Sequence, residues 1–371
     1  HAPAGRPGRA RDKIERPGVG DFARAYDERV RGLASHFVWT NRSKESLTLD
    51  LKHPPARQVL MQLLADADVL VQNLAPGAAA RLGLGFEALH VTHPGLIVCD
   101  ISGYGDDGPY RDKKAYDLLI QSEAGFVSVT GTPDESAKAG CSIADIAAGM
   151  YAYSSILDAL LRRGKTGQGC RVEVSMLESM TEWMGYPLYY AFDGAPPPPR
   201  AGAAHATIFP YGPFPSGDGR TVMLGLQNER EWHSFCQLVL RRPAVATDPR
   251  FASNSQRVVH RDALRALIQE VFGTLSAEQV RARLDEAQIA NASVNDMHDV
   301  WRHPQLAARD RWAQVDTPAG PVPALLPPGT HAAEAPRMDP IPALGQHTEA
   351  ILRGLGWSAA DIARGQEAGV V

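Results

Sequence analysis

Apolar and polar residues follow two different periods along the first half of the chain. Residues 46–51 alternate as in a half-buried strand, and residues 54–65 place apolar side chains at the spacing of one helix face. The continuous apolar runs at 68–73 and 96–102 resemble fully buried strands, with a short helical pattern at 86–92 between them. Strands that alternate with helices are typical of a parallel sheet covered on both faces. The pattern therefore predicts an α/β fold.

The second half continues with helices, short strands and proline-rich stretches. Four consecutive prolines within residues 194–204 indicate a stiff, extended linker. The elements expected around it are a helix at 145–163, a strand at 170–176, a helix at 177–190, a strand at 221–226 and helical patterns at 229–240 and 260–288.

These patterns predict two domains joined by linkers. We expect a large α/β domain over 1–193, a linker over 194–207, a small α+β domain over 208–315, a linker over 316–342 and C-terminal helices over 343–371 that return to the large domain. Residues 1–12 (HAPAGRPGRARD) are rich in Pro, Gly and Arg, so we expect them to be disordered and to supply no strand.

Composition narrows the classes of function. The 371 residues carry 38 Lys and Arg against 42 Asp and Glu, a net charge of −4, which argues against nucleic acid or a membrane surface as a partner. The four cysteines are widely spread, which argues against a zinc site or a disulfide framework. Without an apolar run of about 18–20 residues or a secretory signal, the expected location is cytoplasmic.

A glycine-rich segment follows the predicted strand at 96–102. GYGDDG (103–108) matches the dinucleotide fingerprint G-x-G-x-x-G, but a fingerprint must open a helix that holds pyrophosphate, and Pro109 and a polar run follow here. A turn or a ligand-edge loop is the favoured interpretation, and a nicotinamide site is the minor alternative.

Asp145 stands at the start of the long predicted helix. One interpretation is an N-cap, whose carboxylate accepts hydrogen bonds from the first-turn amides. The other is a catalytic carboxylate, kept ionised by those amides and the helix dipole, with Ala147, Ala148 and Gly149 leaving room for a ligand. The two interpretations are compatible.

Three further groups of residues are weaker candidates. The first group is Lys113, Lys114 and Tyr116, suited to phosphate binding and substrate orientation, with a solvated charge run as the structural alternative. The second is Asn41, Arg42 and Lys44, a local cationic patch or a plain surface turn. The third lies near the second domain and has satisfied structural polar residues as its alternative: His205, Tyr211, Gln227 and Asn228.

An ordered series of short motifs resembles the family III CoA-transferases (the CaiB/BaiF family), most closely the succinyl-CoA:dicarboxylate branch. The motifs run from about Lys13 to the C-terminus: KIERPGVGD, NRSKESLTLDL, VLVQNLAPG, RLGLG, SGYGDDGPY, KKAYD, GKTGQG, HATIFPYGPF, DGRTVMLGLQN and LGQHTEAILRGLGWSAADIARGQEAGVV.

The resemblance implies a fold, an activity and roles for particular residues. It implies a Rossmann-like large domain, an interlocked homodimer, and coenzyme A bound as an acyl-CoA co-substrate, without metal or NAD. CoA would pass from a donor such as succinyl-CoA to a small carboxylic or dicarboxylic acid through an anhydride and a thioester on an aspartate. The implied catalytic residues are Asp145 and Tyr116, the implied CoA contacts are Arg42, Asn73, Arg81 and Lys114, and the candidate substrate contacts are His205, Gln227 and Asn228.

Other functions stay open at this point. The related 2-methylacyl-CoA racemases need a histidine opposite the aspartate. Here the matching position is Tyr116, which favours transfer. An inactive CoA-binding homologue is a further alternative, because HAPAGRPGRARD stands where the family pattern has its first βα unit, which we expect to be missing or altered. An NAD-dependent oxidoreductase ranks last.

Overall fold

The computed structural model describes residues 11–329 and 335–371, which divide into two compact units. The described residues of 1–102, 152–173 and 302–371 form the first unit, and residues 103–151 and 174–301 form the second. Helix α7 (Ile143–Thr166) and strand β5 (Arg171–Ser175) contain residues of both units. The fold is mixed α/β, in agreement with the predicted class.

Parallel strand pairs characterise the first unit. β1 (Asp12–Glu15) pairs in parallel with β2 (Glu45–Thr48), and β3 (Val69–Gln72) pairs in parallel with β4 (Ile97–Ser102) in a sheet of order β3-β4-β5. The remaining elements are α1 (Ser35–Thr40), α2 (Pro54–Ala65), α3 (Ala78–Arg81), α4 (Phe86–Thr92), α15 (Pro304–Ala308), the antiparallel pair β9 (Trp312–Val315) and β10 (Val322–Leu325), α16 (Thr348–Gly354) and α17 (Ala359–Glu367).

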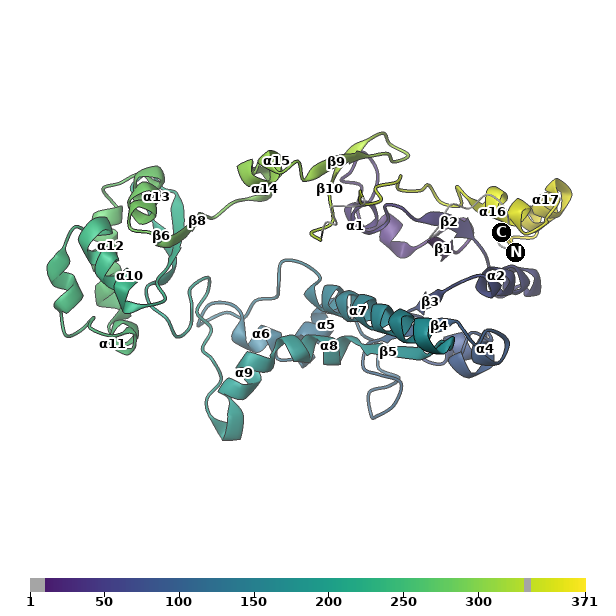
Figure 1. Ribbon diagram of the computed structural model, residues 1–371, viewed down its shortest axis with the longest axis horizontal. Helices are drawn as coiled ribbons and strands as arrows, with labels where there is room; N and C mark the ends of the chain where they lie inside the picture. The colour runs from purple at the N-terminus through teal and green to yellow at the C-terminus, as the bar shows by residue number, and fades with distance from the viewer. Residues whose placement is uncertain (1–10, 330–334) are drawn as a thin grey trace. The chain divides into compact units, whose positions relative to one another are not determined.

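The core of this unit joins the two ends of the chain. Leu47 of β2 and Val59 of α2 are buried in one cluster with Leu352 of α16 and the C-terminal Val370. Figure 1 shows β1 and β2 beside α16. Burial of large aliphatic side chains stabilises by roughly 1.5–3 kcal/mol each, so this shared cluster fixes α16 on the β1–β2 pair.

The second unit contains a separate apolar core around an antiparallel sheet of order β6-β7-β8. Trp232, Phe235, Phe214 and Phe272 are fully buried there, with edge-on ring contacts such as Phe214 to Phe272. Its elements are β6 (Tyr211–Pro215), β7 (Thr221–Gly225), α10 (Glu229–Ser234), a π-helical segment (Phe235–Val239), α11 (Asn254–Val259), α12 (Arg261–Phe272), α13 (Ala277–Glu286), β8 (Ala290–Ser293) and α14 (Met297–Trp301).

A smaller cluster of the second unit surrounds the start of α7. Ile120 of α5 (Asp117–Glu123), Ala144 of α7 and Met180 of α8 (Met176–Trp183) are buried together. In the chain, α6 (Phe126–Val129) lies between α5 and α7, and α9 (Gly185–Tyr190) follows α8. The cluster fixes the N-terminal turn of α7 against α5 and α8.

Most sequence expectations agree with these elements, and four need correction. The helix expected at 145–163 is α7, which spans Ile143–Thr166. The single helix expected at 177–190 is two helices, because Pro187 lacks the amide that would bond to the carbonyl of Trp183. The pattern at 260–288 is also two helices, since Ser276 and Gln279 form a capping box that starts α13. Of the stretch expected to be disordered, residues 1–10 lie outside the described residues, but Asp12 begins β1, so the expectation of no strand is wrong there.

Among the described residues, we find no helix that combines the length and the apolar character needed to cross a membrane.

Candidate active site

Asp145 occupies the third position of α7 and is exposed. The amide of Ile146 donates to the carbonyl of Ser142 (2.9 Å), so the helix begins two residues before Asp145. The N-cap interpretation of Asp145 is therefore wrong, while its place in the first turn still puts a carboxylate at the positive end of the helix dipole.

The first-turn amides of α7 are largely used within the protein. Ile143 donates to the carbonyl of Cys141 (2.8 Å), and Ala144 donates to Oδ1 of Asp117 (2.8 Å). With the Ile146 bond, three amides at this helix start have protein acceptors, so these three are not oxyanion donors for a ligand.

The small residues of α7 fill two different roles. Ala147 and Ala148 are buried and pack against the protein, whereas a Cβ added to Gly149 would have open space around it. The room expected for a ligand is therefore present at Gly149 and absent at the two alanines.

The glycine loop at 103–108 ends without a helix. Residues 103–116 form turns and bends, and a Cβ on Gly103 would lie 2.2 Å from the Cβ of Ala115. Glycine is required at this position by close packing against the segment that carries Lys114 and Tyr116. The loop lacks the helix N-terminus on which a dinucleotide fingerprint depends.

Lys113 and Lys114 differ although they are adjacent. Lys113 forms an ion pair with Glu123, and its Nζ lies 4.2 Å from the ring centroid of Tyr110. The hydrogen bond to Glu123 raises the pKa of Lys113. Lys114 is exposed and makes no hydrogen bond or ion pair with any described residue. Lys114 is therefore the lysine of this pair that is available to a phosphate or thioester ligand.

Tyr116 directly precedes Asp117, which bonds to the start of α7. Its side chain is 69% exposed and does not cap α5, which begins at the next residue, Asp117. Because Asp117 accepts from the amide of Ala144, the backbone at Tyr116 is held near the residue that precedes Asp145. Tyr116 and Asp145 are thus the chain neighbours of Asp117 and Ala144, the two residues joined by this hydrogen bond in the second unit.

The three candidate substrate residues have unequal structural roles. Asn228 caps α10, since its Oδ1 accepts from the amide of Glu231 (3.0 Å). The ring of His205 stacks on Tyr211, and its Nδ1 accepts from the amide of Thr207. Gln227 is exposed and only its backbone is bonded, to the carboxylate of Glu231.

The candidate CoA contacts Arg42, Asn73 and Arg81 belong to the first unit. Asn73 is exposed directly after β3, and Arg81 ends α3 with its Nη1 3.0 Å from where a Cβ on Gly77 would lie. Gly77 has a φ of +71°, so glycine permits the turn that folds Arg81 back. Arg42 is half-buried and makes no hydrogen bond with a described residue.

The side chain of Gln72 holds the backbone around Asn73 in place, a role that the sequence alone did not predict. Its Nε2 donates to Asp100 of β4 (2.8 Å), and its Oε1 accepts from the amide of Leu74 (2.7 Å). Asp100 also accepts from Arg171 of β5 (2.7 Å). This cross-strand network fixes the segment in which Asn73 is presented.

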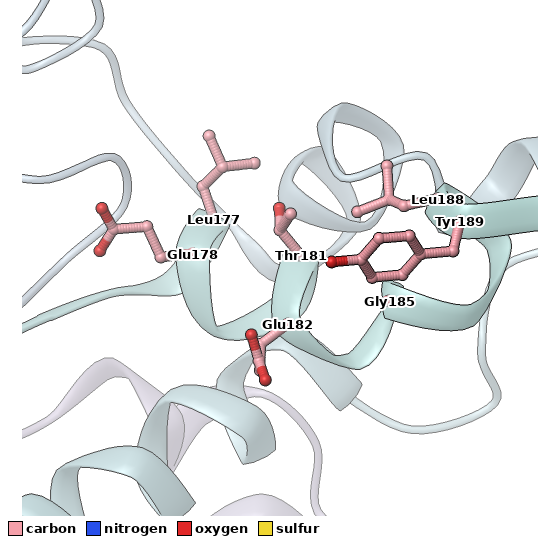
Figure 2. A pocket seen from close by; sticks show the side chains of 7 residues that line it. All are labelled: Leu177, Glu178, Thr181, Glu182, Gly185, Leu188 and Tyr189. Carbon is pink, nitrogen blue, oxygen red and sulfur yellow. The ribbon is translucent and has the colours of Figure 1, made fainter. Parts of the chain in front are cut away.

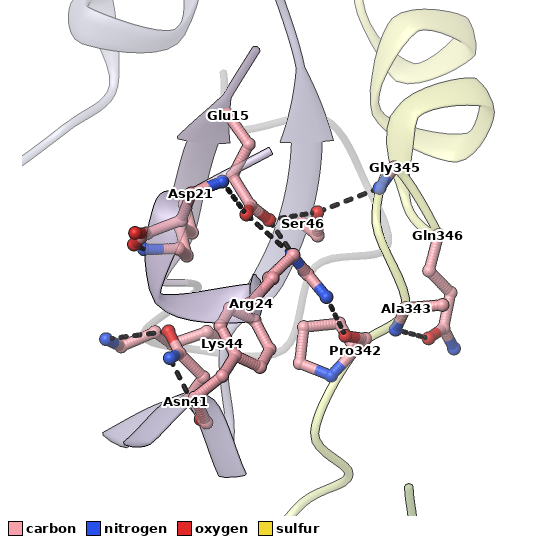
Figure 3. A network of polar contacts seen from close by, with 12 residues as sticks. Glu15, Asp21, Arg24, Asn41, Lys44, Ser46, Pro342, Ala343, Gly345 and Gln346 are labelled. Atoms are coloured by element: carbon pink, nitrogen blue, oxygen red, sulfur yellow. Dashed lines mark hydrogen bonds and ion pairs between the residues drawn. The ribbon is translucent and has the colours of Figure 1, made fainter. Parts of the chain in front are cut away.

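A second network explains two of the family-like motifs in structural terms. The buried carboxylate of Glu15 accepts from Arg24 at both oxygens (2.8 Å each) and from Ser46 (2.6 Å), as Figure 3 shows. Ser46 in turn accepts from the amide of Gly345 (2.9 Å), and Arg24 donates to the carbonyl of Pro342. KIERPGVGD and LGQHTEA therefore hold the C-terminal segment on β1 and β2.

A hollow on α8 and α9 has none of the predicted site residues in its lining. It measures about 430 Å³ and is lined by Leu177, Glu178, Thr181, Glu182, Gly185, Leu188 and Tyr189 (Figure 2). The lining has two carboxylates and no cation, which is unfavourable for the phosphates of CoA. Among residues 11–329 and 335–371, no group of three or more His, Cys, Asp or Glu side chains is arranged to hold a metal ion.

Comparison with known proteins identifies relatives over nearly the whole chain. The family model described as CoA-transferase family III matches residues 13–348. An acyl-CoA transferase of Fusarium pseudograminearum is 33% identical over 97% of this chain and 81% of its own length. A succinate–glutarate CoA-transferase of Agrobacterium fabrum is 32% identical over 92% of this chain and 88% of its own.

A solved structure is similar as well. The crystal structure of a CAIB/BAIF family protein from Brucella suis superimposes with a TM-score of 0.82 at 32% identity, over 93% of this chain and 91% of that one. The match in sequence and in fold extends over nearly all of the chain, which belongs to CoA-transferase family III.

Proposed function

We propose that this protein transfers CoA from an acyl-CoA donor such as succinyl-CoA to a small dicarboxylic acid, with Asp145 as the nucleophile. The observation that carries the proposal is the exposed Asp145 in the first turn of α7, on a unit that also presents Tyr116 and an unpaired Lys114. The relatives named as succinate–glutarate and succinyl-CoA:glutarate transferases support a dicarboxylate acceptor.

An ionised carboxylate suits this reaction because it needs no general base at neutral pH. Asp145 attacks the thioester carbonyl of the donor, the C–S bond breaks, and CoA leaves as a thiolate while the donor acyl group and Asp145 form a mixed anhydride. The thiolate then attacks the aspartyl carbonyl, which releases the donor acid and leaves an aspartyl-CoA thioester.

The second half of the cycle repeats these steps in reverse. The acceptor carboxylate attacks the aspartyl thioester and forms a second anhydride, and the released thiolate attacks the acceptor acyl carbon. The products are the new CoA thioester and free Asp145. The cycle converts the donor thioester and the acceptor carboxylate into the acceptor thioester and the donor carboxylate, with no net transfer of a proton or an electron.

In this proposal Lys114, Arg42, Asn73 and Arg81 bind CoA, and Tyr116 lies at the reacting thioester. Lysine and arginine provide the local positive charge for the CoA phosphates that the net charge of −4 does not supply. Of the three candidate substrate residues, His205 and Gln227 are assigned to the acceptor side, whereas Asn228 is assigned to capping α10. Gln227 differs from His205 and Asn228 because only its backbone, and not its side chain, is hydrogen-bonded to a described residue.

The domain boundaries and the interlocked homodimer are also part of the proposal. A self-contained core between Phe209 and Ile289 supports a small domain within 208–315, and the Ser46–Gly345 bond supports a C-terminal segment that returns to the Rossmann-like large domain. The exposed apolar side chains of Met150, Tyr153 and Leu157 on α7 are what a subunit interface would cover. Sedimentation at several protein concentrations tests the dimer.

The activity is tested by incubating the protein with succinyl-CoA and a panel of carboxylic acids, then detecting new CoA esters by mass spectrometry. Hydroxylamine should trap the acylated enzyme as a hydroxamate at Asp145. Asp145→Asn should abolish transfer, whereas Asp158→Asn, an exposed aspartate of the same helix, should not. Transfer that survives Asp145→Asn would remove Asp145 as the nucleophile. Deuterium uptake at the α-carbon without ester exchange would indicate a racemase instead.

A further inference from the structure

Asp117 uses both carboxylate oxygens to connect α5 with the start of α7. Its Oδ1 accepts from the amide of Ala144 at 2.8 Å, and its Oδ2 accepts from Nε2 of Gln121 at 2.6 Å. Asp117 and Gln121 are four residues apart on α5, so their side chains lie on one helix face. One carboxylate therefore bonds to its own helix and to the helix that carries Asp145.

Gln121 extends this connection to the loop before α7. It is fully buried, and its Oε1 accepts from the amide of Ala139 at 2.9 Å. The loop from 139 to 144 is thus held at both ends by two side chains of α5. We refer to Asp117 and Gln121 with these three hydrogen bonds as the α5 clamp.

The clamp acts one residue away from the proposed nucleophile. Ala144 is fully buried in the cluster with Ile120 and Met180, so its amide has little freedom once Asp117 holds it. The Cα of Asp145 follows directly, and its carboxylate is directed by the orientation of this first turn. A misplacement of about 1 Å costs up to about 100-fold in rate when reacting groups must meet in a defined geometry.

We propose that Asp117 is a positioning residue for the transfer reaction, acting through the Ala144 amide to set the direction of the Asp145 carboxylate. The inference rests on the proposed function of Asp145. Asp117 itself contacts neither CoA nor the acceptor in this role. Loss of the clamp should therefore reduce the rate of the chemical step and leave substrate binding nearly unchanged.

The first test separates kcat from KM. Asp117→Ala should lower kcat by about 10- to 100-fold and change the KM for succinyl-CoA less than about twofold. Ser122→Ala is the matched control, because Ser122 lies on the same helix and bonds only to the carbonyl of Leu118. That variant should keep the wild-type kcat.

The second test exchanges the donor and the acceptor of the hydrogen bond between residues 117 and 121. Asp117→Asn alone places an amide group against the Gln121 amide, and Gln121→Glu alone places two carboxylates together; both should lower kcat. In the double variant the asparagine donates to the introduced glutamate, which still accepts from Ala139, while the asparagine oxygen still accepts from Ala144. We expect the double variant to recover most of the wild-type kcat.

Amide hydrogen exchange separates the clamp from the activity. In Asp117→Ala the amides of the 139–146 segment should exchange faster than in wild type, and in the double variant they should regain protection. If Asp117→Ala transfers CoA at the wild-type kcat, or the double variant recovers protection without recovering kcat, the positioning role is overturned. If the wild-type protein makes no CoA ester from any acid while the exchange results hold, the proposed function fails and the clamp stands.

Discussion

Lys113 is paired with Glu123, ten residues along the chain, and its ammonium also lies over the rings of Tyr104 and Tyr110. The adjacent Lys114 has no such partners among the described residues. Two lysines that are equivalent in sequence therefore have different tasks: the first holds the segment between the glycine loop and α5, and the second is available to a ligand.

This difference predicts unequal effects of the two alanine variants on substrate binding. Lys114→Ala should raise the KM for succinyl-CoA about tenfold, which corresponds to the loss of roughly 1.4 kcal/mol of binding. Lys113→Ala should change that KM less than about twofold, because its charge is already paired. Initial-rate measurements over a range of succinyl-CoA concentrations provide the comparison; equal effects on KM would contradict the assignment.

Glu15 should contribute to stability in a pH-dependent way. Burial raises its pKa, but hydrogen bonds from Arg24 and Ser46 outweigh this effect, and the net pKa lies below the ordinary 4.5. The stabilisation is therefore fully present above about pH 4.5 and is lost as the pH falls through the lowered pKa. We expect Glu15→Gln to reduce the free energy of unfolding at pH 7 by about 3–5 kcal/mol, because it leaves the largely buried Arg24 without a carboxylate partner.

Urea denaturation between pH 3 and 7 checks this prediction. The acid dependence should be weaker in Glu15→Gln than in wild type. Glu349→Gln, which removes an exposed pair with Arg353, is the control and should change stability by less than about 1 kcal/mol. A Glu15→Gln protein as stable as this control would show that the buried pair contributes little.

Lys44 should have the opposite effect on stability. Burial, together with the charge of Lys13, lowers its pKa from 10.5 to about 8, so the folded protein disfavours the protonated lysine. Lys44→Met should therefore be more stable than wild type at pH 7. Between about pH 8 and 10.5 the unfolded chain binds more protons than the folded one, so wild-type stability rises relative to the variant and the difference shrinks. Thermal melts from pH 7 to 10.5, with the exposed Lys52→Met as a charge-matched control, measure this change. A difference that stays constant with pH would contradict it.

Asn228 should prove to be a structural residue. Replacing this N-cap by alanine should destabilise the protein by about 1 kcal/mol, whereas Asn228→Asp keeps an acceptor for the Glu231 amide and should be tolerated. Gln227→Ala should leave stability unchanged and raise the KM for the acceptor acid. Guanidinium denaturation and acceptor titrations separate the two residues; a raised acceptor KM in Asn228→Asp with normal stability would instead place Asn228 at the substrate.

The parts of the fold that the sequence predicted well are those with local causes. α2 and α4 have the predicted bounds because helical periodicity, and in α2 a proline at the first position, act within a few residues. β1 was missed because four residues become a strand only through pairing with β2, thirty residues later in the chain. The start of α7 was placed too late because its amides are satisfied by Asp117, which is distant in sequence.

The residues of the candidate site show the same difference between local causes and contacts that are distant in sequence. Asn228 followed three residues later by Glu231 is a local capping signal that was available in the sequence. The difference between Lys113 and Lys114 depends on Glu123 and two tyrosine rings, and no spacing argument ranks two adjacent lysines. The family resemblance identified Asp145, but the hydrogen bonds that orient its helix were visible only in three dimensions.

The bond between Thr48 and Thr348 has a consequence for biosynthesis. The amide and hydroxyl of Thr48 on β2 both bond to the Thr348 hydroxyl, across a sequence separation of 300 residues. At a translation rate of about 5–20 residues per second, β2 leaves the ribosome roughly 15–60 s before its partner. During that interval its polar groups and the apolar surface around Leu47 stay uncovered. The first unit is therefore completed only once Thr348 has been made, and chaperone dependence should be concentrated in its N-terminal strands.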